Sequence, residues 1–316
     1  MLRQIFIKLS LVPQAQPVLA RVPVASALVR RFIAGERIDE AMAVARALNG
    51  AGLNLSLDFL GESVSAMAEA VAAADTYLRL LDQIAELGVR AYVSIKLTQF
   101  GIDLDPQGCQ RLVRQVARRA AATGSFLRVD MEGTAHTDRT IALVQEVHSE
   151  IAAIGTVLQA YLYRSEADLH TLASAGIRIR LCKGAYQEPP DRAFPAKADV
   201  DANFVRLSRL LLSYSNACGP ADPAGRVPAL AALATHDERM IAAARAHIER
   251  LRIPRDRFEF QMLYGVRRDL QERLVREGFA VRTYVPFGTH WYPYFMRRLA
   301  ERPANVWFIA ANLFRQ

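Results

Sequence analysis

The sequence predicts a (β/α)8 barrel of the TIM type that follows an N-terminal helical arm. Eight strand-like runs alternate with eight helix-like runs over about 260 of the 316 residues, which matches the size and repeat number of such a barrel. Strands and helices that alternate at this spacing indicate right-handed crossovers and parallel strands. No GxGxxG motif follows the first strand, which disfavours a dinucleotide-binding sheet. A doubly wound open sheet is the alternative, although its repeats are usually fewer and less regular.

Residues 1–50 are predicted to form the helical arm, and residues 51–316 the barrel domain. Apolar positions recur at helical spacing in 25–36 and 38–52, and Gly50 is typical of a helix stop. The arm is too short to be a domain of its own.

The barrel elements are predicted from the change between short apolar runs and long segments with helical periodicity. The expected strands are 54–62, 91–101, 126–133, 155–165, 177–186, 228–237, 258–265 and 280–288. The helices expected between and after them are 63–88, 105–124, 137–152, 166–176, 200–219, 238–251, 266–278 and 291–302.

Charge and cysteine content limit the class of protein. The net charge of +8 is spread along helix-like segments, which suggests attraction to anionic ligands or to an acidic membrane surface, and no nucleic-acid recognition motif is present. Three cysteines without paired spacing argue against disulfides or a zinc site and fit a reducing compartment. No apolar run approaches the roughly 20 residues that a membrane helix needs. We expect a cytoplasmic protein that contacts membranes at most peripherally.

Polar side chains occur near the end of almost every predicted strand. A single one is often only part of an internal hydrogen-bonded layer, but barrel enzymes carry their chemistry at these ends. Together they predict a deep polar pocket with excess positive charge. The residues are Asp58, Gly61, Glu62, Lys96, Thr98, Gln99, Arg128, Asp130, Glu132, Gln159, Tyr161, Tyr163, Arg164, Arg180, Lys183, Gly184, Tyr186, Thr235, His236, Asp237, Glu259, Gln261, Tyr264, Arg282 and Tyr284.

The segment 284–298 joins the last strand to a helix that carries Tyr294, Arg297 and Arg298. Two adjacent arginines one turn beyond a tyrosine form an anion-binding surface, because a guanidinium group grips a carboxylate at two points. Taken alone, the pattern is also typical of a solvated helix face. Its place after the eighth strand puts it at the catalytic rim of the predicted barrel.

The residues alone leave other chemistries open. Lys96 in a strand is compatible with the Schiff-base nucleophile of a barrel aldolase. The arginine pair is also compatible with a non-catalytic barrel that binds an anionic metabolite. A metal site at His236, with Asp237 and Glu132, is disfavoured because it has a single histidine, so no metal is expected.

Six motifs, in order between about residues 54 and 308, resemble those of the flavin-dependent proline dehydrogenases: VDMEG, LQAYLYRS, RLCKGAY, ATHD, FEFQMLYG and RTYVPFG…YFMRRLAE. The family includes single-activity bacterial enzymes and the matching domain of bifunctional proline utilisation proteins. The 316 residues leave no room for the aldehyde dehydrogenase domain of the latter, so we expect the single-activity type. The resemblance implies a distorted (β/α)8 barrel that holds FAD non-covalently and oxidises L-proline to Δ1-pyrroline-5-carboxylate. It also implies hydride transfer to flavin N5, a quinone acceptor at a membrane, and a separate pyrroline-5-carboxylate dehydrogenase as a partner.

The resemblance assigns roles to residues around the substrate. Lys96, Arg297 and Arg298 match the cations that bind the proline carboxylate and so fix its orientation. Tyr284, which excludes bulkier substrates such as hydroxyproline, packs around the proline ring with Tyr294, Leu263 and Ala185. Glu62 matches a glutamate that pairs with Arg297 in the empty site as an ionic gate. The catalytic residues implied are Asp130, which supports the flavin and substrate layer, and Arg180, a cation near flavin N5 that stabilises reduced flavin.

The resemblance also assigns contacts with FAD. Gln159 matches a partner of the flavin ring, Gly184 lets the backbone approach the cofactor, and Thr235 and His236 match contacts to its adenosine and phosphate part. The sequence departs from the family at Gln187 and at Pro195, which leaves Lys197 without an assigned role. The full set of expected FAD contacts is Met131, Gln159, Arg180, Lys183, Gly184, Ala185, Thr235, His236 and Glu301.

Overall fold

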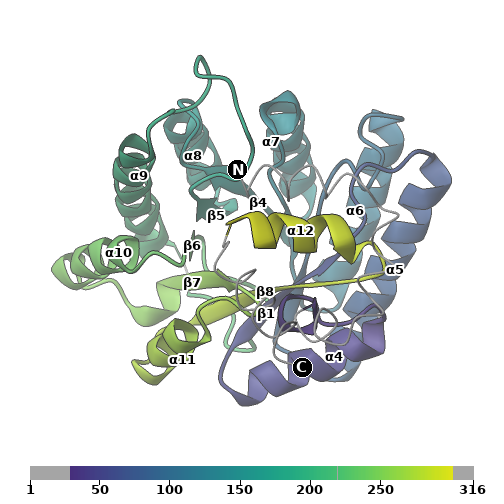
Figure 1. The fold of residues 1–316 in the computed structure, drawn as a ribbon, viewed down its shortest axis with the longest axis horizontal. Coiled ribbons are helices and arrows are strands. Elements are labelled where there is room, and N and C mark those ends of the chain that lie inside the picture. Colours follow the sequence, from purple (N-terminus) through teal and green to yellow (C-terminus); the bar gives the residue numbers. More distant parts are fainter. Residues whose placement is uncertain (1–28, 219, 302–316) are drawn as a thin grey trace, which may run out of the picture.

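The computed structural model describes residues 29–218 and 220–301, with the side chains of 300 and 301 excepted. Within these residues, eight parallel strands close into one barrel in sequence order, which confirms the predicted fold (Figure 1). Closure comes from the pairing of the first and last strands, as in Ser56 with Tyr284, which excludes an open sheet. The strands are β1 (Asn54–Phe59), β2 (Ala91–Ile95), β3 (Leu127–Val129), β4 (Ile154–Gln159), β5 (Arg178–Cys182), β6 (Ala231–Ala234), β7 (Phe258–Leu263) and β8 (Val281–Phe287).

The strand sequences serve two surfaces, because successive side chains point to opposite faces. In β1, Leu55 and Leu57 belong to the main hydrophobic core, whereas Ser56 and Asp58 form hydrogen bonds inside the barrel. This alternation positions polar side chains in the barrel interior. The predicted runs extended beyond several strands because the loops that follow also carry buried apolar residues, such as Leu97 and Phe100 after β2.

The helices surround the strands, and their apolar faces complete the core (Figure 1). The helix that precedes the barrel, α4, packs against β1, β8 and α5. The remaining described part of the predicted arm is short, and residues 1–28 lie outside the described residues. The helices are α4 (Ile38–Gly50), α5 (Met67–Glu86), α6 (Pro106–Ala122), α7 (Thr134–Glu150), α8 (Ser165–Ser174), α9 (Lys197–Ala217), α10 (Glu238–Leu251), the short 3-10 helix η2 (Arg255–Arg257), α11 (Arg268–Arg276) and α12 (Trp291–Glu301).

The last helix, α12, differs in placement from the others. Figure 1 shows it across the centre of the strands, whereas α5 to α11 surround them. Trp291 and Phe295 of α12 pack with Phe32 and Ile33 in a second hydrophobic cluster, separate from the main core. The indole Nε1 of Trp291 donates to Glu36 at 2.9 Å. Contacts with the segment before α4 therefore hold α12 over the barrel.

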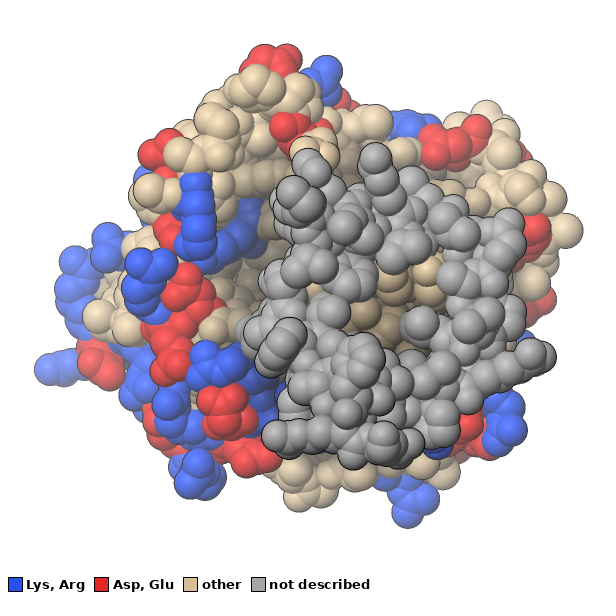
Figure 2. Space-filling view, viewed as in Figure 1, with Lys and Arg blue, Asp and Glu red and all other residues tan. Residues whose placement is uncertain are grey.

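Charged side chains on the surface around α10 and α11 are interleaved in sign (Figure 2). Glu238 accepts hydrogen bonds from Arg267 at 2.6 Å and from Arg273 at 2.5 Å. Many basic groups on this face are therefore paired.

No helix in the described part of the chain is long and apolar enough to cross a membrane.

Candidate active site

Five ionisable side chains meet inside the barrel at the carboxyl ends of the strands. The phenol oxygen of Tyr284 lies 2.6 Å from Oδ2 of Asp58 and 2.8 Å from Oδ2 of Asp130. Parallel strands bring their carboxyl ends to the same edge, so residues far apart in sequence converge there. We call this edge the mouth of the barrel, and we call the group the central cluster: Asp58, Lys96, Asp130, Arg180 and Tyr284.

Arg180 of β5 forms the base of the central cluster. Its Nη1 donates to Oδ1 of Asp130 at 2.8 Å, and its Nε donates to the side chain of Gln261 at 2.6 Å. Burial alone would lower the pKa of Arg180, but Tyr92 and Asp130 raise it above its ordinary value, so the group is a fixed cation. Its Nη2 also lies 3.1 Å from each of the hydroxyls of Ser56, Tyr92 and Ser94.

Lys96 follows β2 and points into the same group. Its Nζ donates to Oδ2 of Asp58 at 3.1 Å and to the hydroxyl of Tyr284 at 3.3 Å. Burial opposes the charge of Lys96, but Asp58, Asp130 and Glu62 raise its pKa well above the ordinary value. A Schiff-base lysine requires the opposite shift, so this environment disfavours the aldolase interpretation.

The arginines of α12 lie at the rim of the mouth. Nη2 of Arg297 donates to Oε1 of Glu62 at 2.9 Å, and this glutamate oxygen is 3.9 Å from Nζ of Lys96. The guanidinium of Arg298 lies over the ring of buried Tyr294, 5.2 Å from its centroid. The structure thus connects the predicted carboxylate-binding group to the central cluster through Glu62.

Among the residues expected around the flavin ring, Gln159 is hydrogen-bonded to two backbone groups after neighbouring strands. The amide of Gln159 donates to the backbone oxygen of Glu132 at 3.0 Å and accepts from the backbone of Ala185 at 3.3 Å. Gly184 has φ +127°, and a Cβ there would lie 2.4 Å from the Tyr161 ring. The close packing of Tyr161 therefore explains this glycine. Met131 is buried in the main core.

A second charged group lies at the ends of β5 and β6. Nζ of Lys183 donates to Asp201 at 2.5 Å and to Asp237 at 2.9 Å, and Lys197 donates to the other oxygen of Asp201 at 2.5 Å. The cations there are therefore gathered around Asp201. Asp201 lies on α9, where its residue type and spacing carry no signal of a site, so the sequence reasoning missed it.

His236 and Thr235 have structural contacts at the end of β6. Nε2 of His236 accepts from the backbone N–H of Leu263 at 2.9 Å, which joins the ends of β6 and β7. Oγ1 of Thr235 accepts from the backbone of Asp237 at 3.1 Å. Glu132 is held by Thr98, and no group of three or more His, Cys, Asp or Glu side chains that could hold a metal ion occurs among the described residues. The side chain of Glu301 lies outside the described residues.

Three of the polar residues expected to line the pocket lie deeper in the barrel, and for these the prediction is wrong. Nε of Arg282 donates to Glu259 at 2.8 Å, and Nη1 donates to the backbone of Leu55 near the start of β1. Arg128 donates to the backbone of Arg178, the first residue of β5. Their long side chains extend toward the amino-terminal ends of the strands.

Asp58 is the main contact that the residue assignments above omitted. In the sequence, Asp58 is one of many polar residues at strand ends, and no role was assigned to it. In the structure its single oxygen Oδ2 contacts both Lys96 and Tyr284. A closed barrel already makes β1 and β8 neighbours, but periodicity does not give their register, which pairs Ser56 with Tyr284 and puts Asp58 two residues further along β1.

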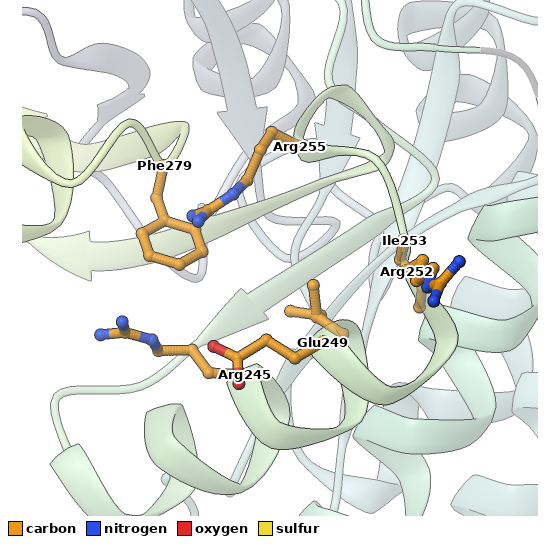
Figure 3. Close-up of a pocket in the computed structure, with 7 residues that line it drawn as sticks. Arg245, Glu249, Arg252, Ile253, Arg255 and Phe279 are labelled. Atoms are coloured by element: carbon orange, nitrogen blue, oxygen red, sulfur yellow. The ribbon is translucent and has the colours of Figure 1, made fainter.

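A cavity of about 210 Å³ lies away from the mouth, between α10, η2 and the approach to β8 (Figure 3). The guanidinium of Arg255 stacks over the Phe279 ring, 3.6 Å from its centroid. Arg245, which also lines the cavity, forms an ion pair with Glu277 at 2.7 Å. None of the predicted site residues lines this cavity, so the central cluster is the better candidate for the chemistry.

Comparison with known proteins identifies the family of this chain. Residues 41–311 match the family model described as proline dehydrogenase. The chain is 39% identical over 293 residues to the proline dehydrogenase of Deinococcus radiodurans, with 91% of this chain and 90% of that protein covered. It is 36% identical over 287 residues to proline dehydrogenase 1 of Bacillus subtilis (strain 168), with 91% of both covered.

A solved structure shares the fold. Proline utilization A from Bdellovibrio bacteriovorus, inactivated by N-propargylglycine, matches with a TM-score of 0.78 and 26% identity over 88% of this chain. The chain spans only 33% of that larger protein. The family model and the two full-length relatives cover almost the whole barrel of the present chain. The chain therefore belongs to the proline dehydrogenase family of enzymes, which oxidise proline to pyrroline-5-carboxylate.

Proposed function

We propose that this proline dehydrogenase is FAD-dependent and oxidises L-proline by hydride transfer from the ring carbon next to nitrogen to flavin N5. The observation that carries the proposal is the convergence of Lys96, Arg180 and Tyr284 in the central cluster, with Arg297 linked to it through Glu62. This arrangement offers cations for a carboxylate beside an aromatic wall. It suits a small cyclic amino acid.

The substrate carboxylate is assigned to Lys96, Arg297 and Arg298. Lys96 is fixed by hydrogen bonds, whereas among the described residues Arg297 is held only by the carboxylate of Glu62, and its side chain is 39% exposed. A substrate carboxylate competes with Glu62 for Arg297, because both are anions that suit a guanidinium group. Tyr284, Tyr294 and Leu263 then enclose the ring, and Glu62 serves as the gate.

The residues present fit a flavin nucleotide. Gln159 and Arg180 are buried on the neighbouring strands β4 and β5, and the buried cation of Arg180 suits the ring of a reduced flavin. Lys183 supplies a cation for a diphosphate close to the amino terminus of α10, an end of a helix that favours anions. We therefore assign the cofactor to the expected residues: Met131, Gln159, Arg180, Lys183, Gly184, Ala185, Thr235, His236 and Glu301.

When bound, the flavin supplies the two-electron acceptor that oxidation of the C–N bond requires. The chain's own part is to orient the substrate and to provide a fixed electrostatic environment. Asp130 keeps Arg180 in place through their 2.8 Å ion pair, and Arg180 in turn lies 5.1 Å from the centroid of the Tyr284 ring. These contacts set the position of the wall against which the proline ring packs.

We further propose that a quinone at a membrane surface takes the electrons and that a separate pyrroline-5-carboxylate dehydrogenase takes the product. The net charge of +8 supports attraction to an anionic surface. Oxidation of the proline-reduced protein by a soluble quinone, followed by absorbance, tests the acceptor. Sedimentation with anionic and with neutral vesicles tests the attraction to membranes.

An absorbance spectrum tests the central proposal. The purified protein should be yellow, or become so on addition of FAD, and should bleach when L-proline is added without oxygen. D-proline serves as a control for the ligand. A colourless protein that does not take up added FAD would overturn the cofactor assignment, and a yellow protein that L-proline does not bleach would overturn the substrate assignment.

A further inference from the structure

Asp58 occupies a special position in the central cluster. Its side chain is 1% exposed, and one oxygen, Oδ2, meets the hydroxyl of Tyr284 at 2.6 Å and Nζ of Lys96 at 3.1 Å. This inference rests on the proposed function, in which both Tyr284 and Lys96 bind the substrate. Asp58 therefore contacts two substrate-binding groups.

The short contacts of Tyr284 limit where protons can lie in the central cluster. Its hydroxyl carries one hydrogen but makes short contacts with two carboxyl groups, at 2.6 Å to Asp58 and 2.8 Å to Asp130. Its one hydrogen satisfies only one of the two contacts at a time, so the pair of contacts can accept a further proton. Asp130 is already engaged as a carboxylate in the ion pair with Arg180. A proton that the cluster takes up is therefore best placed on Asp58.

We propose that Asp58 is a positioning residue that takes up a proton when an anionic substrate binds, and so releases the charge of Lys96 to the substrate carboxylate. With Asp58 ionised, the ammonium of Lys96 is neutralised by the carboxylate 3.1 Å away. With Asp58 protonated, the same contact is retained as a hydrogen bond and the positive charge of Lys96 faces the mouth. Asp58 acts through Lys96 and Tyr284, without contact with the reacting atoms.

The groups around Asp58 favour this uptake. Burial raises its pKa above the ordinary value and Asp130 adds to the effect, whereas Lys96 and the hydrogen bond from Tyr284 oppose it. Tyr77 of α5 also faces Asp58, with its hydroxyl 3.4 Å from Oδ1. A substrate carboxylate adds another negative charge nearby and raises the pKa further.

A nearby carboxyl group provides a matched control. Glu132 is also buried, and burial raises its pKa, but its oxygens accept from the backbone and hydroxyl of Thr98. It forms no hydrogen bond with Lys96 or Tyr284 within the described residues. Glu132→Gln therefore removes a buried acid of the same region without removing the contacts assigned to Asp58.

The probe is cyclopentanecarboxylate, a proline analogue that lacks the amine and so does not itself titrate near neutral pH. Its binding to the FAD-loaded protein is measured by calorimetry from pH 6 to 9 in buffers of different ionisation enthalpy. Wild type and E132Q should take up as much as one proton per molecule bound, and the dissociation constant Kd should rise by up to roughly tenfold per pH unit where the uptake occurs. Asp58→Asn, which mimics the protonated acid, should show no uptake and a pH-independent Kd.

The alternative outcomes are distinct. Absence of uptake by wild type, persistence of uptake in D58N, or loss of uptake in E132Q alone would each overturn the role of Asp58. If D58N does not fold, Tyr284→Phe tests the same shared proton and should reduce the uptake. Bleaching by L-proline without proton uptake would refute only Asp58, whereas failure of both bleaching and analogue binding would refute the proposed function as well.

Discussion

Replacement of Glu62 by glutamine tests whether the substrate carboxylate competes for Arg297. The ion pair spans 2.9 Å between side chains that are 29% and 39% exposed. A pair exposed to this extent contributes about 0.2–1 kcal/mol, which is a factor of roughly 1.4 to 5 in binding. Glu62 also lies 3.9 Å from Lys96, so its charge opposes a bound carboxylate at a second cation. Both effects predict that E62Q lowers KM for proline, by about two- to fivefold.

The assay separates binding from turnover. Steady-state KM and kcat are measured for E62Q and for Glu272→Gln, an exposed change on α11 with the same loss of charge. Because KM equals the dissociation constant only when chemistry is slow, the Kd of cyclopentanecarboxylate is measured as well. The gain should shrink at high salt, which screens exposed pairs. A KM and a Kd that both rise in E62Q would show that Glu62 stabilises the loaded site, and would refute the competition.

Three further changes probe other parts of the barrel. Arg298→Met should raise KM roughly tenfold or more by removing a charge-assisted hydrogen bond, and an unchanged KM would place the carboxylate elsewhere. Glu259→Gln should lower the free energy of unfolding by about 3–5 kcal/mol because Arg282 stays buried without its charged partner. Denaturant titration measures this loss, and Glu277→Gln serves as the exposed control. A Glu259→Gln variant as stable as that control would contradict the prediction. Gly184→Ala should destabilise more than Gly176→Ala for two reasons: the added methyl meets the Tyr161 ring, and the φ of +127° lies further from the left-handed helical region than the +75° of Gly176. Equal effects in thermal unfolding would contradict this explanation.

The order of the barrel strands was predictable because periodicity changes from two to about 3.6 at each boundary. The depth of each side chain within the barrel was not. Arg128 and Asp130 lie two residues apart near the end of β3, and the sequence presents both as polar strand-end residues. The rise of about 3.3 Å per residue separates their backbones, and the long side chain of Arg128 then bonds near the start of β5.

The position of α12 across the barrel could not be predicted from the alternation of strands and helices. Its apolar periodicity suits an eighth helix of the outer ring, but Trp291, Tyr292, Phe295 and Met296 are all buried. So broad an apolar surface signals burial on more than one side. The partner surface comes from a segment more than 250 positions earlier, as the Trp291–Glu36 hydrogen bond shows. Such a long-range contact leaves no mark in local periodicity.

The charges at the mouth explain why proton uptake and substrate binding should be coupled. Before substrate enters, three cations at the mouth each pair with one carboxyl group: Lys96 with Asp58, Arg180 with Asp130, and Arg297 with Glu62. A bound carboxylate upsets this balance by one negative charge, in a region where burial makes uncompensated charge unfavourable. Proline in its zwitterionic form brings its own compensating proton, but oxidation of the C–N bond requires the amine lone pair. A proton that moves onto Asp58 restores the balance and leaves the amine neutral.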